Sequence, residues 1–192
     1  MSQQPPSEAR ATLLAKVVAH FAEHGVRDTS LRSLAAAIGT SQRMLNYHFG
    51  SREDVLIAVI DAIAASQGEQ MRTLFADEPD PFTAGQRNWE ATEAGARIYG
   101  PLWFELATHA MHGEPYAARL GEVMVNAQLR AFTEVYSGYT DPARAARLAR
   151  LTLSVGQGLI FNLLIDNDRA GAEAAIAEFA DMIRGQLTDT RP

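Results

Sequence analysis

A run of polar side chains between residues 42 and 48 is the part of the sequence best suited to recognising another molecule. Helical spacing places Met44, Leu45 and Phe49 on an apolar side of this segment. The opposite face then carries amide, guanidinium, phenol and imidazole groups with few acidic neighbours: Gln42, Arg43, Asn46, Tyr47 and His48. Because Arg pairs with guanine and Gln or Asn with adenine at major-groove edges, this chemistry favours base recognition in DNA.

Two capped helices and a glycine are expected to position this face. Ser30 caps a helix that runs to about Ile38, Gly39 ends it, and a second helix starts immediately afterwards. A polar face on one short helix is usually ordinary surface, but two caps and a turn glycine in register predict a helix-turn-helix. Hydroxyl, imidazole and guanidinium groups in and beside the two helices are candidates for phosphate contacts: Ser30, Thr40, Ser41, Tyr47, His48 and Arg52.

The distribution of charge supports the same interpretation. The whole chain of 192 residues has a net charge of −6, which by itself argues against a nucleic-acid partner. Residues 1–52, however, contain six basic and three acidic side chains, a net charge of +3, so residues 53–192 carry −9. Since attraction to phosphate acts within a Debye length of about 8 Å, the local positive charge is the relevant quantity.

Other chemistries find little support in the sequence. The run from His20 to His24 matches the H-x-x-E-H metalloprotease pattern, but Phe21 is needed in the core and no third ligand is suggested. His109 and His112 lack a neighbouring carboxylate cluster, and no nucleophile–base pair or carboxylate dyad is apparent. We therefore expect no catalytic residue, no metal and no cofactor. The chain has no cysteine, no secretory signal and no unbroken run of about 18 apolar residues, which favours a cytoplasmic protein without a membrane segment.

Hydrophobic periodicity predicts an all-α protein without internal repeats. No segment alternates with period two for long enough to suggest a sheet. A three-helix head is expected over residues 1–52, followed by a helical bundle over residues 53–192. Helices are expected near 8–24, 31–38, 42–48, 51–75, 82–95, 98–112, 115–137, 143–166 and 170–187.

Apolar stripes on the last two helices allow two interpretations. They either pack within one subunit or form a four-helix interface with a second copy about a twofold axis. The candidate interface residues are Leu151, Val155, Leu159, Ile176, Phe179 and Ile183. Bulky side chains between residues 82 and 137 are equally open to two interpretations, since such residues at helical spacing are more often plain core than a ligand cavity.

Residues 29–60, TSLRSLAAAIGTSQRMLNYHFGSREDVLIAVI, resemble the N-terminal domain of the TetR family of one-component transcriptional repressors. The resemblance rests on Thr29-Ser30, the Ala-Ile-Gly turn, Tyr47-His48-Phe49 and the Ser51-to-Asp54 cap. Arg43 and Asn46 depart from the family's usual pattern on the reading face, so the resemblance implies no operator sequence.

The resemblance implies a homodimer that binds a pseudo-palindromic site in double-stranded DNA and a small-molecule inducer. It also implies an inducer cavity in the C-terminal bundle, where Glu105 is one of the polar groups among the large side chains. The candidate ligand-binding residues are Trp89, Glu93, Tyr99, Trp103, Phe104, His109, Met124, Gln128 and Phe132. The leading hypothesis is a ligand-responsive DNA-binding regulator that acts as a repressor. The alternatives are an all-helical small-molecule binding protein or enzyme without a DNA role, and a helix-turn-helix protein used as a cofactor or antitoxin.

Overall fold

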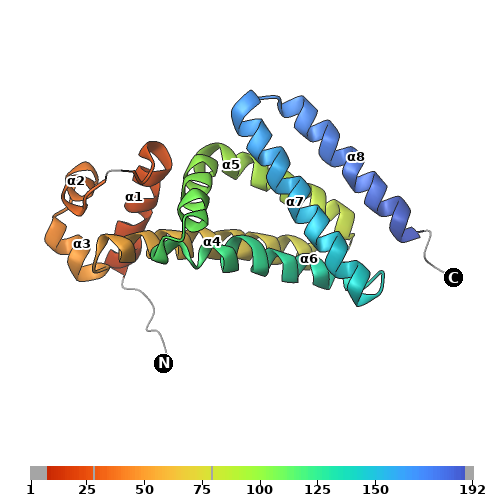
Figure 1. The fold of residues 1–192 in the computed structure, drawn as a ribbon, viewed down its shortest axis with the longest axis horizontal. Helices are drawn as coiled ribbons and strands as arrows, with labels where there is room; N and C mark the ends of the chain where they lie inside the picture. Colours follow the sequence, from red (N-terminus) through yellow and green to blue (C-terminus); the bar gives the residue numbers. More distant parts are fainter. Residues whose placement is uncertain (1–7, 28, 79, 189–192) are drawn as a thin grey trace. The chain divides into compact units, whose positions relative to one another are not determined.

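All regular secondary structure in the described residues is helical, which confirms the predicted all-α class. The computed structural model describes residues 8–27, 29–78 and 80–188. Most of the N-terminal segment MSQQPPSEAR, in which no secretory signal is expected, lies outside these ranges. The helices are α1 (Glu8–His24), α2 (Leu31–Ala37), α3 (Gln42–His48), α4 (Arg52–Asp77), α5 (Pro81–Met111), the 3₁₀ turn η1 (Pro115–Ala117), the π-helical turn η2 (Glu122–Asn126), α6 (Ala127–Ser137), α7 (Pro142–Asp166) and α8 (Arg169–Thr188) (Figure 1).

Packing divides the chain into two compact units. Unit 1 comprises residues 1–64 and 101–120, and unit 2 comprises residues 65–100 and 121–192. The division falls within α4 at Ala64–Ala65 and within α5 at Gly100–Pro101, so each of these helices supplies residues to both units. A functional boundary near residue 52 stays a prediction, because this division is one of packing.

The helix-turn-helix in unit 1 is built from the local signals that the sequence contains. Ser30 and Ser41 are the N-caps of α2 and α3, and each side chain accepts a hydrogen bond from the backbone N–H three residues later. Gly39 has a φ of +71°, a left-handed conformation that is unfavourable for any residue with a Cβ atom. The turn at Gly39 therefore lets α3 start directly after α2 ends.

The core of unit 1 joins α1, α2, α3 and α4. Phe21 of α1, Leu34 of α2, Leu45 of α3 and Leu56 of α4 are each at most 1% exposed. Such complete burial contributes roughly 1.5–3 kcal/mol for each large apolar side chain. These contacts leave the opposite side of α3 in solvent.

A reciprocal capping box starts α4. The backbone N–H of Ser51 donates to Oδ2 of Asp54 at 2.9 Å, and the Asp54 N–H donates to Oγ of Ser51 at 3.2 Å. These bonds favour the ionised carboxylate. The backbone N–H of Ser51 and then its hydroxyl therefore hold the pKa of Asp54 below its ordinary range.

We expect Asp54→Asn to remove part of the acid sensitivity of folding. Because the pKa of Asp54 is lowered in the folded protein, its ionised form stabilises the fold above the unfolded pKa, about 4. That contribution is lost as the pH falls through the folded pKa. The difference in the free energy of unfolding between wild type and Asp54→Asn should therefore shrink between about pH 5 and pH 3. Urea titrations across this range measure it, and a constant difference would contradict it.

The region from residue 81 to residue 111 differs from expectation. Two helices were predicted near 82–95 and 98–112, but α5 is one helix of 31 residues with Pro101 inside it. A proline removes one backbone N–H donor and usually interrupts a helix. Here Ala96, Leu102 and Trp103 are buried on either side of that position, so tertiary packing holds the helix together.

The single helix predicted over residues 115–137 is also wrong in detail, because the segment is not one continuous α-helix. The segment begins with the short 3₁₀ turn η1 and contains the π-helical turn η2 before α6. Apolar periodicity does not distinguish these tighter and wider turns from α-helix, since they share its handedness and side-chain types. A π-helical turn inside a helix is frequent at functional sites.

Unit 2 includes α6, α7 and α8, with α8 returning alongside α7 in Figure 1. Leu148, Ile183 and Leu187 form a buried cluster against Phe82, Tyr136 and Phe179. By length and composition α7 could also cross a membrane, with a mean hydropathy of 1.5 over an 18-residue window. Six of its 25 residues are buried, and 28% of that window is buried, so packing on α6 and α8 accounts for part of this apolar character.

Candidate nucleic-acid interface

The predicted reading face of α3 is exposed in the structure. Gln42, Arg43, Asn46 and Tyr47 all lie at the surface, and Tyr47 is 79% exposed. Leu45 is fully buried beneath them and fixes which side of the helix faces outwards. His48 is half-buried, so the structure brings four of the five predicted polar groups together on one open surface.

Met44 was assigned wrongly to the core. Its side chain is 41% exposed, whereas Leu45 alone is the buried residue of α3. A seven-residue helix can direct few side chains inwards, and the neighbouring Leu45 already fills that position. Met44 therefore adds an apolar group to the exposed face, where apolar side chains can contact the methyl group of thymine.

The hydroxyl residues predicted to contact phosphate lie close to the helix starts. Ser30 and Ser41 are exposed, and their Oγ atoms accept the capping N–H groups of Ser33 at 3.1 Å and Met44 at 3.2 Å. The Ser30 hydroxyl is also hydrogen-bonded to Oγ of Ser33 at 2.9 Å, and the Ser41 hydroxyl has a proton that it can donate. Thr40 is half-buried in the turn. Phosphate contact by these three residues stays a prediction.

Arg10 of α1 holds the far end of α3, a role that sequence inspection did not find. Its Nε donates to the carbonyl oxygen of His48 at 3.1 Å, and its guanidinium lies 4.9 Å from the ring centroid of Phe49. A cation at a helix C-terminus is stabilised by the unpaired carbonyl groups there. The partners are 38 residues apart in sequence, so no local pattern indicates the contact.

The Arg52 side chain donates hydrogen bonds to backbone carbonyls within unit 1. Its Nε donates to the carbonyl of Thr29 at 2.8 Å and its Nη2 to the carbonyl of Val26 at 2.7 Å. The side chain thus binds the loop between α1 and α2. Its predicted contact with phosphate remains untested, and the structure adds a second role for the same guanidinium.

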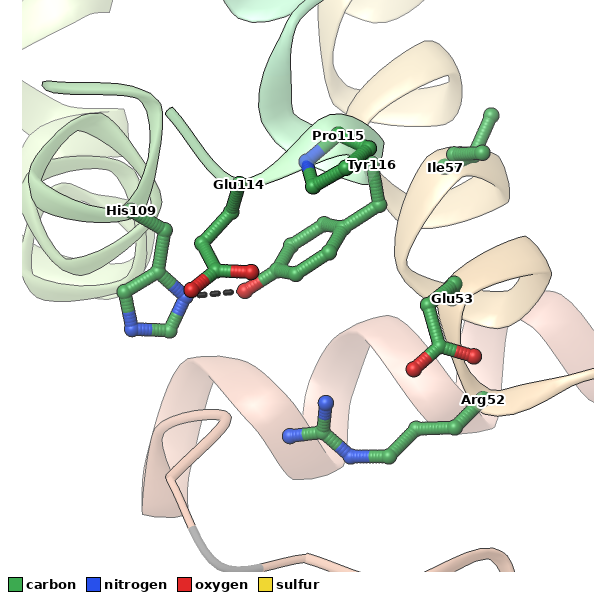
Figure 2. A pocket seen from close by; sticks show the side chains of 7 residues that line it. All are labelled: Arg52, Glu53, Ile57, His109, Glu114, Pro115 and Tyr116. Atoms are coloured by element: carbon green, nitrogen blue, oxygen red, sulfur yellow. Dashed lines mark hydrogen bonds between the residues drawn. The ribbon is translucent and has the colours of Figure 1, made fainter. Parts of the chain in front are cut away.

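A cavity of about 560 Å³ adjoins Arg52 within unit 1. Figure 2 shows five polar side chains around it, together with Ile57 and Pro115: Arg52, Glu53, His109, Glu114 and Tyr116. The Tyr116 hydroxyl is hydrogen-bonded to Nδ1 of His109, and burial raises the pKa of Tyr116. The volume falls in the range of small-molecule sites, roughly 300–1,000 Å³.

The nine predicted ligand-binding residues are divided between the two units. Trp103, Phe104 and His109 belong to unit 1, and His109 alone of the nine lines the cavity beside Arg52. Unit 2 contains the other six: Trp89, Glu93, Tyr99, Met124, Gln128 and Phe132. Trp89 and Trp103 are each less than 10% exposed, whereas Tyr99, Phe104, Met124, Gln128 and Phe132 are half-buried.

Glu93 has protein partners for both carboxylate oxygens. It is 5% exposed, with Oε1 at 3.0 Å from Nε of Arg97 and Oε2 at 3.3 Å from Nη2 of Arg169. The second pair joins α5 to the start of α8 within unit 2. Glu93 therefore has a structural role in addition to the predicted ligand contact, which stays untested.

We expect Glu93→Ala to lower the free energy of unfolding by about 1–3 kcal/mol, because it removes a buried charge that two guanidinium groups share. Arg169→Ala should cost about 1 kcal/mol, since that side chain is 59% exposed and solvent screens the pair. Arg72→Ala breaks an exposed pair with Glu69 and should change stability by less than about 0.5 kcal/mol. Urea unfolding followed by helicity measures all three, and equal losses would contradict the assignment.

The six predicted interface residues of α7 and α8 differ in exposure. Leu151 is 47% exposed, while Val155, Leu159, Ile176 and Phe179 are half-buried. Ile183 is 3% exposed and packs on Leu148 within the same chain. Sequence spacing did not separate Ile183 from Ile176 and Phe179, because all three lie on one apolar stripe of α8.

The caps, the turn glycine and the exposed polar face of α3 define a helix-turn-helix DNA-binding protein. Residues 13–59 match the family described as "Bacterial regulatory proteins, tetR family". The chain is 29% identical over 186 residues to the HTH-type transcriptional regulatory protein RaaS of Mycobacterium tuberculosis, covering 93% of this chain and 83% of that protein. It is 37% identical over 87 residues to the HTH-type transcriptional dual regulator CecR of Shigella flexneri, covering 42% of this chain and 38% of that protein.

Solved structures agree with this fold. A TetR transcriptional regulator from Legionella pneumophila superposes with a TM-score of 0.76 at 18% identity, covering 95% of this chain and 99% of that one. At this identity the likeness speaks for the fold alone. Residues 13–59 are therefore similar in sequence to the DNA-binding head of the TetR family, and the whole chain is similar in fold to a solved TetR regulator. The protein is a DNA-binding transcriptional regulator.

Proposed function

We propose that this regulator is a homodimeric repressor that binds a pseudo-palindromic operator and leaves it when a small molecule binds. The observation that carries the proposal is the exposed face of α3, where Gln42, Arg43, Asn46 and Tyr47 surround the buried Leu45. In a dimer, two such helices enter the major groove at two half-sites. We place this regulator in the cytoplasm, because its proposed partner is operator DNA.

Side-chain chemistry divides the proposed DNA-contacting residues into those that read bases and those that contact phosphates. Gln42, Arg43 and Asn46 read base edges, because amide and guanidinium groups can make paired hydrogen bonds there. The hydroxyl groups of Ser30, Thr40, Ser41 and Tyr47, with His48 and Arg52, contact phosphates, which position the protein without reading sequence.

Exposed apolar groups support dimerisation through unit 2. Leu151, Phe161 and Ile165 of α7 and Met182 of α8 are between 47% and 67% exposed. Apolar side chains gathered on two neighbouring helices favour association with another surface. We propose that α7 and α8 pair with the same helices of a second copy, with Leu151, Val155 and Leu159 contributing from α7.

Two features support a response to a small molecule. The cavity beside His109 has a suitable volume and includes Arg52, whose guanidinium binds the loop that precedes α2. In unit 2, the π-helical turn η2 includes Met124 and is followed closely by Gln128, both predicted ligand residues. A ligand that prefers one arrangement of either region would shift the equilibrium between DNA-binding and non-binding conformations. The coupling free energy between ligand binding and DNA binding would be roughly 1–3 kcal/mol.

The test is retention of fragmented genomic DNA from the source organism by the purified protein, at low and at moderate salt. Recovery of a palindromic site that survives the salt increase establishes sequence-specific binding. Retention that is uniform and salt-sensitive would leave only a non-specific basic head. Small molecules related to the genes beside the site are then tested for release of the DNA and for quenching of Trp89 and Trp103.

A further inference from the structure

In the loop between α1 and α2, the backbone N–H and the carbonyl of Val26 are each hydrogen-bonded to a side chain. The backbone N–H of Val26 donates to Oε2 of Glu105 at 2.9 Å, and its carbonyl accepts from Nη2 of Arg52 at 2.7 Å. The carboxylate comes from α5 and the guanidinium from α4. Side chains of opposite charge from two different helices therefore fix a single residue of this loop.

Gly25 makes the approach of Glu105 possible. Its φ is +74°, and a Cβ atom at this position would lie 2.7 Å from Oε2 of Glu105. Glycine thus ends α1 in a left-handed conformation and leaves room for the carboxylate. Val26 itself is 0% exposed, so removal of Glu105 would leave its N–H without an acceptor in a place that water does not reach.

The same contacts lead to the helix-turn-helix. Nε of Arg52 donates to the carbonyl of Thr29, and the next residue, Ser30, caps α2. Helix α2 packs on α3 through Leu34, Ala35 and Leu45, which are at most 2% exposed. The position of α3 is therefore connected, through packed and hydrogen-bonded groups of unit 1, to the residues that bind Val26.

We propose that Glu105 is a positioning residue for DNA binding. Its carboxylate holds the α1–α2 loop, and the loop in turn holds the start of α2 and the presentation of α3. Glu105 was expected from sequence to be a polar group of an inducer cavity, whereas its observed partner is the backbone of the DNA-binding head. The inference rests on the DNA-binding function and adds a residue of α5 to it.

The sign of the change in DNA affinity distinguishes a positioning role of Glu105 from an effect of its negative charge alone. Removing an acidic side chain from unit 1 takes away repulsion toward phosphate, so a pure charge effect strengthens DNA binding. A positioning role predicts the opposite sign. Glu105→Met keeps the length of the side chain but has no carboxylate acceptor, whereas Glu105→Gln keeps an oxygen that accepts the Val26 N–H.

The experiment compares wild type, Glu105→Met, Glu105→Gln and Glu23→Ala on a duplex carrying the palindromic site recovered from genomic DNA. Glu23 is an exposed acid of α1 and controls for loss of charge. We expect Glu105→Met to bind about 5–10-fold more weakly with an unchanged salt slope, because it touches no phosphate. Glu105→Gln should regain most of the affinity, and Glu23→Ala should bind as tightly as wild type or slightly more so.

Amide hydrogen exchange at Val26 tests the contact without DNA, and the exchange rate should rise in Glu105→Met but not in Glu105→Gln. Wild-type affinity for the duplex tests the function, so failure of the function and failure of the proposal are separable. The proposal is overturned if Glu105→Met binds like wild type, if both Glu105 variants are weakened equally, or if Val26 exchange is unchanged. It is also overturned if Glu105→Met fails to fold, because Glu105 would then determine global stability.

Discussion

Replacement of Arg43 by alanine is expected to weaken operator binding by about 1–3 kcal/mol and to relax the preference at one base pair in each half-site. Arg43 is exposed on α3, beside Gln42 and Asn46 on the face opposite the buried Leu45. A guanidinium makes two hydrogen bonds to guanine, and no other base offers the same pair of acceptors. The loss should therefore depend on sequence.

Arg43→Lys is the matched control, because it keeps the positive charge without the two-pronged geometry. We expect it to bind non-specific DNA as wild type does while discriminating less between the operator and single-base variants of it. Competition binding against a set of such variants measures the discrimination. Equal weakening of Arg43→Ala on every sequence, with a salt slope reduced by about one, would instead assign Arg43 to a phosphate.

Local signals explain why the DNA-binding motif could be predicted from the sequence. Ser30 and Ser41 act as caps through neighbours three residues away, and Gly39 acts through its own positive φ. Such features depend on backbone geometry that residue type specifies directly. The predicted caps and the positive φ of the turn glycine are all present.

Contacts between distant segments could not be predicted in this way. Glu105 binds Val26 across 79 residues, and Arg10 binds the His48 carbonyl across 38 residues. Sequence spacing indicated that Glu105 is polar on a helix, but the identity of its partner depends on how α5 packs in unit 1. Met44 shows the same limit, since a short helix leaves its apolar residues with two possible faces.

The continuous α5 shows how packing overrides local preference. The break predicted between residues 95 and 98 is absent, and the helix also runs through Gly100 and Pro101, two residue types that often interrupt helices. Gly100 is buried within unit 2, and a Cβ atom there would lie 2.5 Å from Cδ1 of Leu164. A glycine that appears to be a helix breaker is therefore a site of close approach between α5 and α7.

Arg52 offers the sharpest test of whether a basic residue in the head contacts DNA or supports the fold. We expect Arg52→Lys to lower the free energy of unfolding by about 1–3 kcal/mol, because an ammonium group cannot reproduce the fork that binds the carbonyls of Val26 and Thr29 at 2.7 and 2.8 Å. Operator binding should weaken by a similar factor for all sequences, since the loop position affects the whole of α3.

The lysine variant separates the two roles because it keeps the charge. A residue that only contacts phosphate tolerates Arg52→Lys, and Arg52→Ala then lowers the salt slope by about one. A residue that holds the α1–α2 loop is impaired by both substitutions, with the salt slope of Arg52→Lys unchanged. Urea unfolding and salt-titrated DNA binding measure the two quantities, with Arg72→Lys in unit 2 as the control. Impairment by lysine would place Arg52 beside Glu105 as the second side chain that fixes Val26.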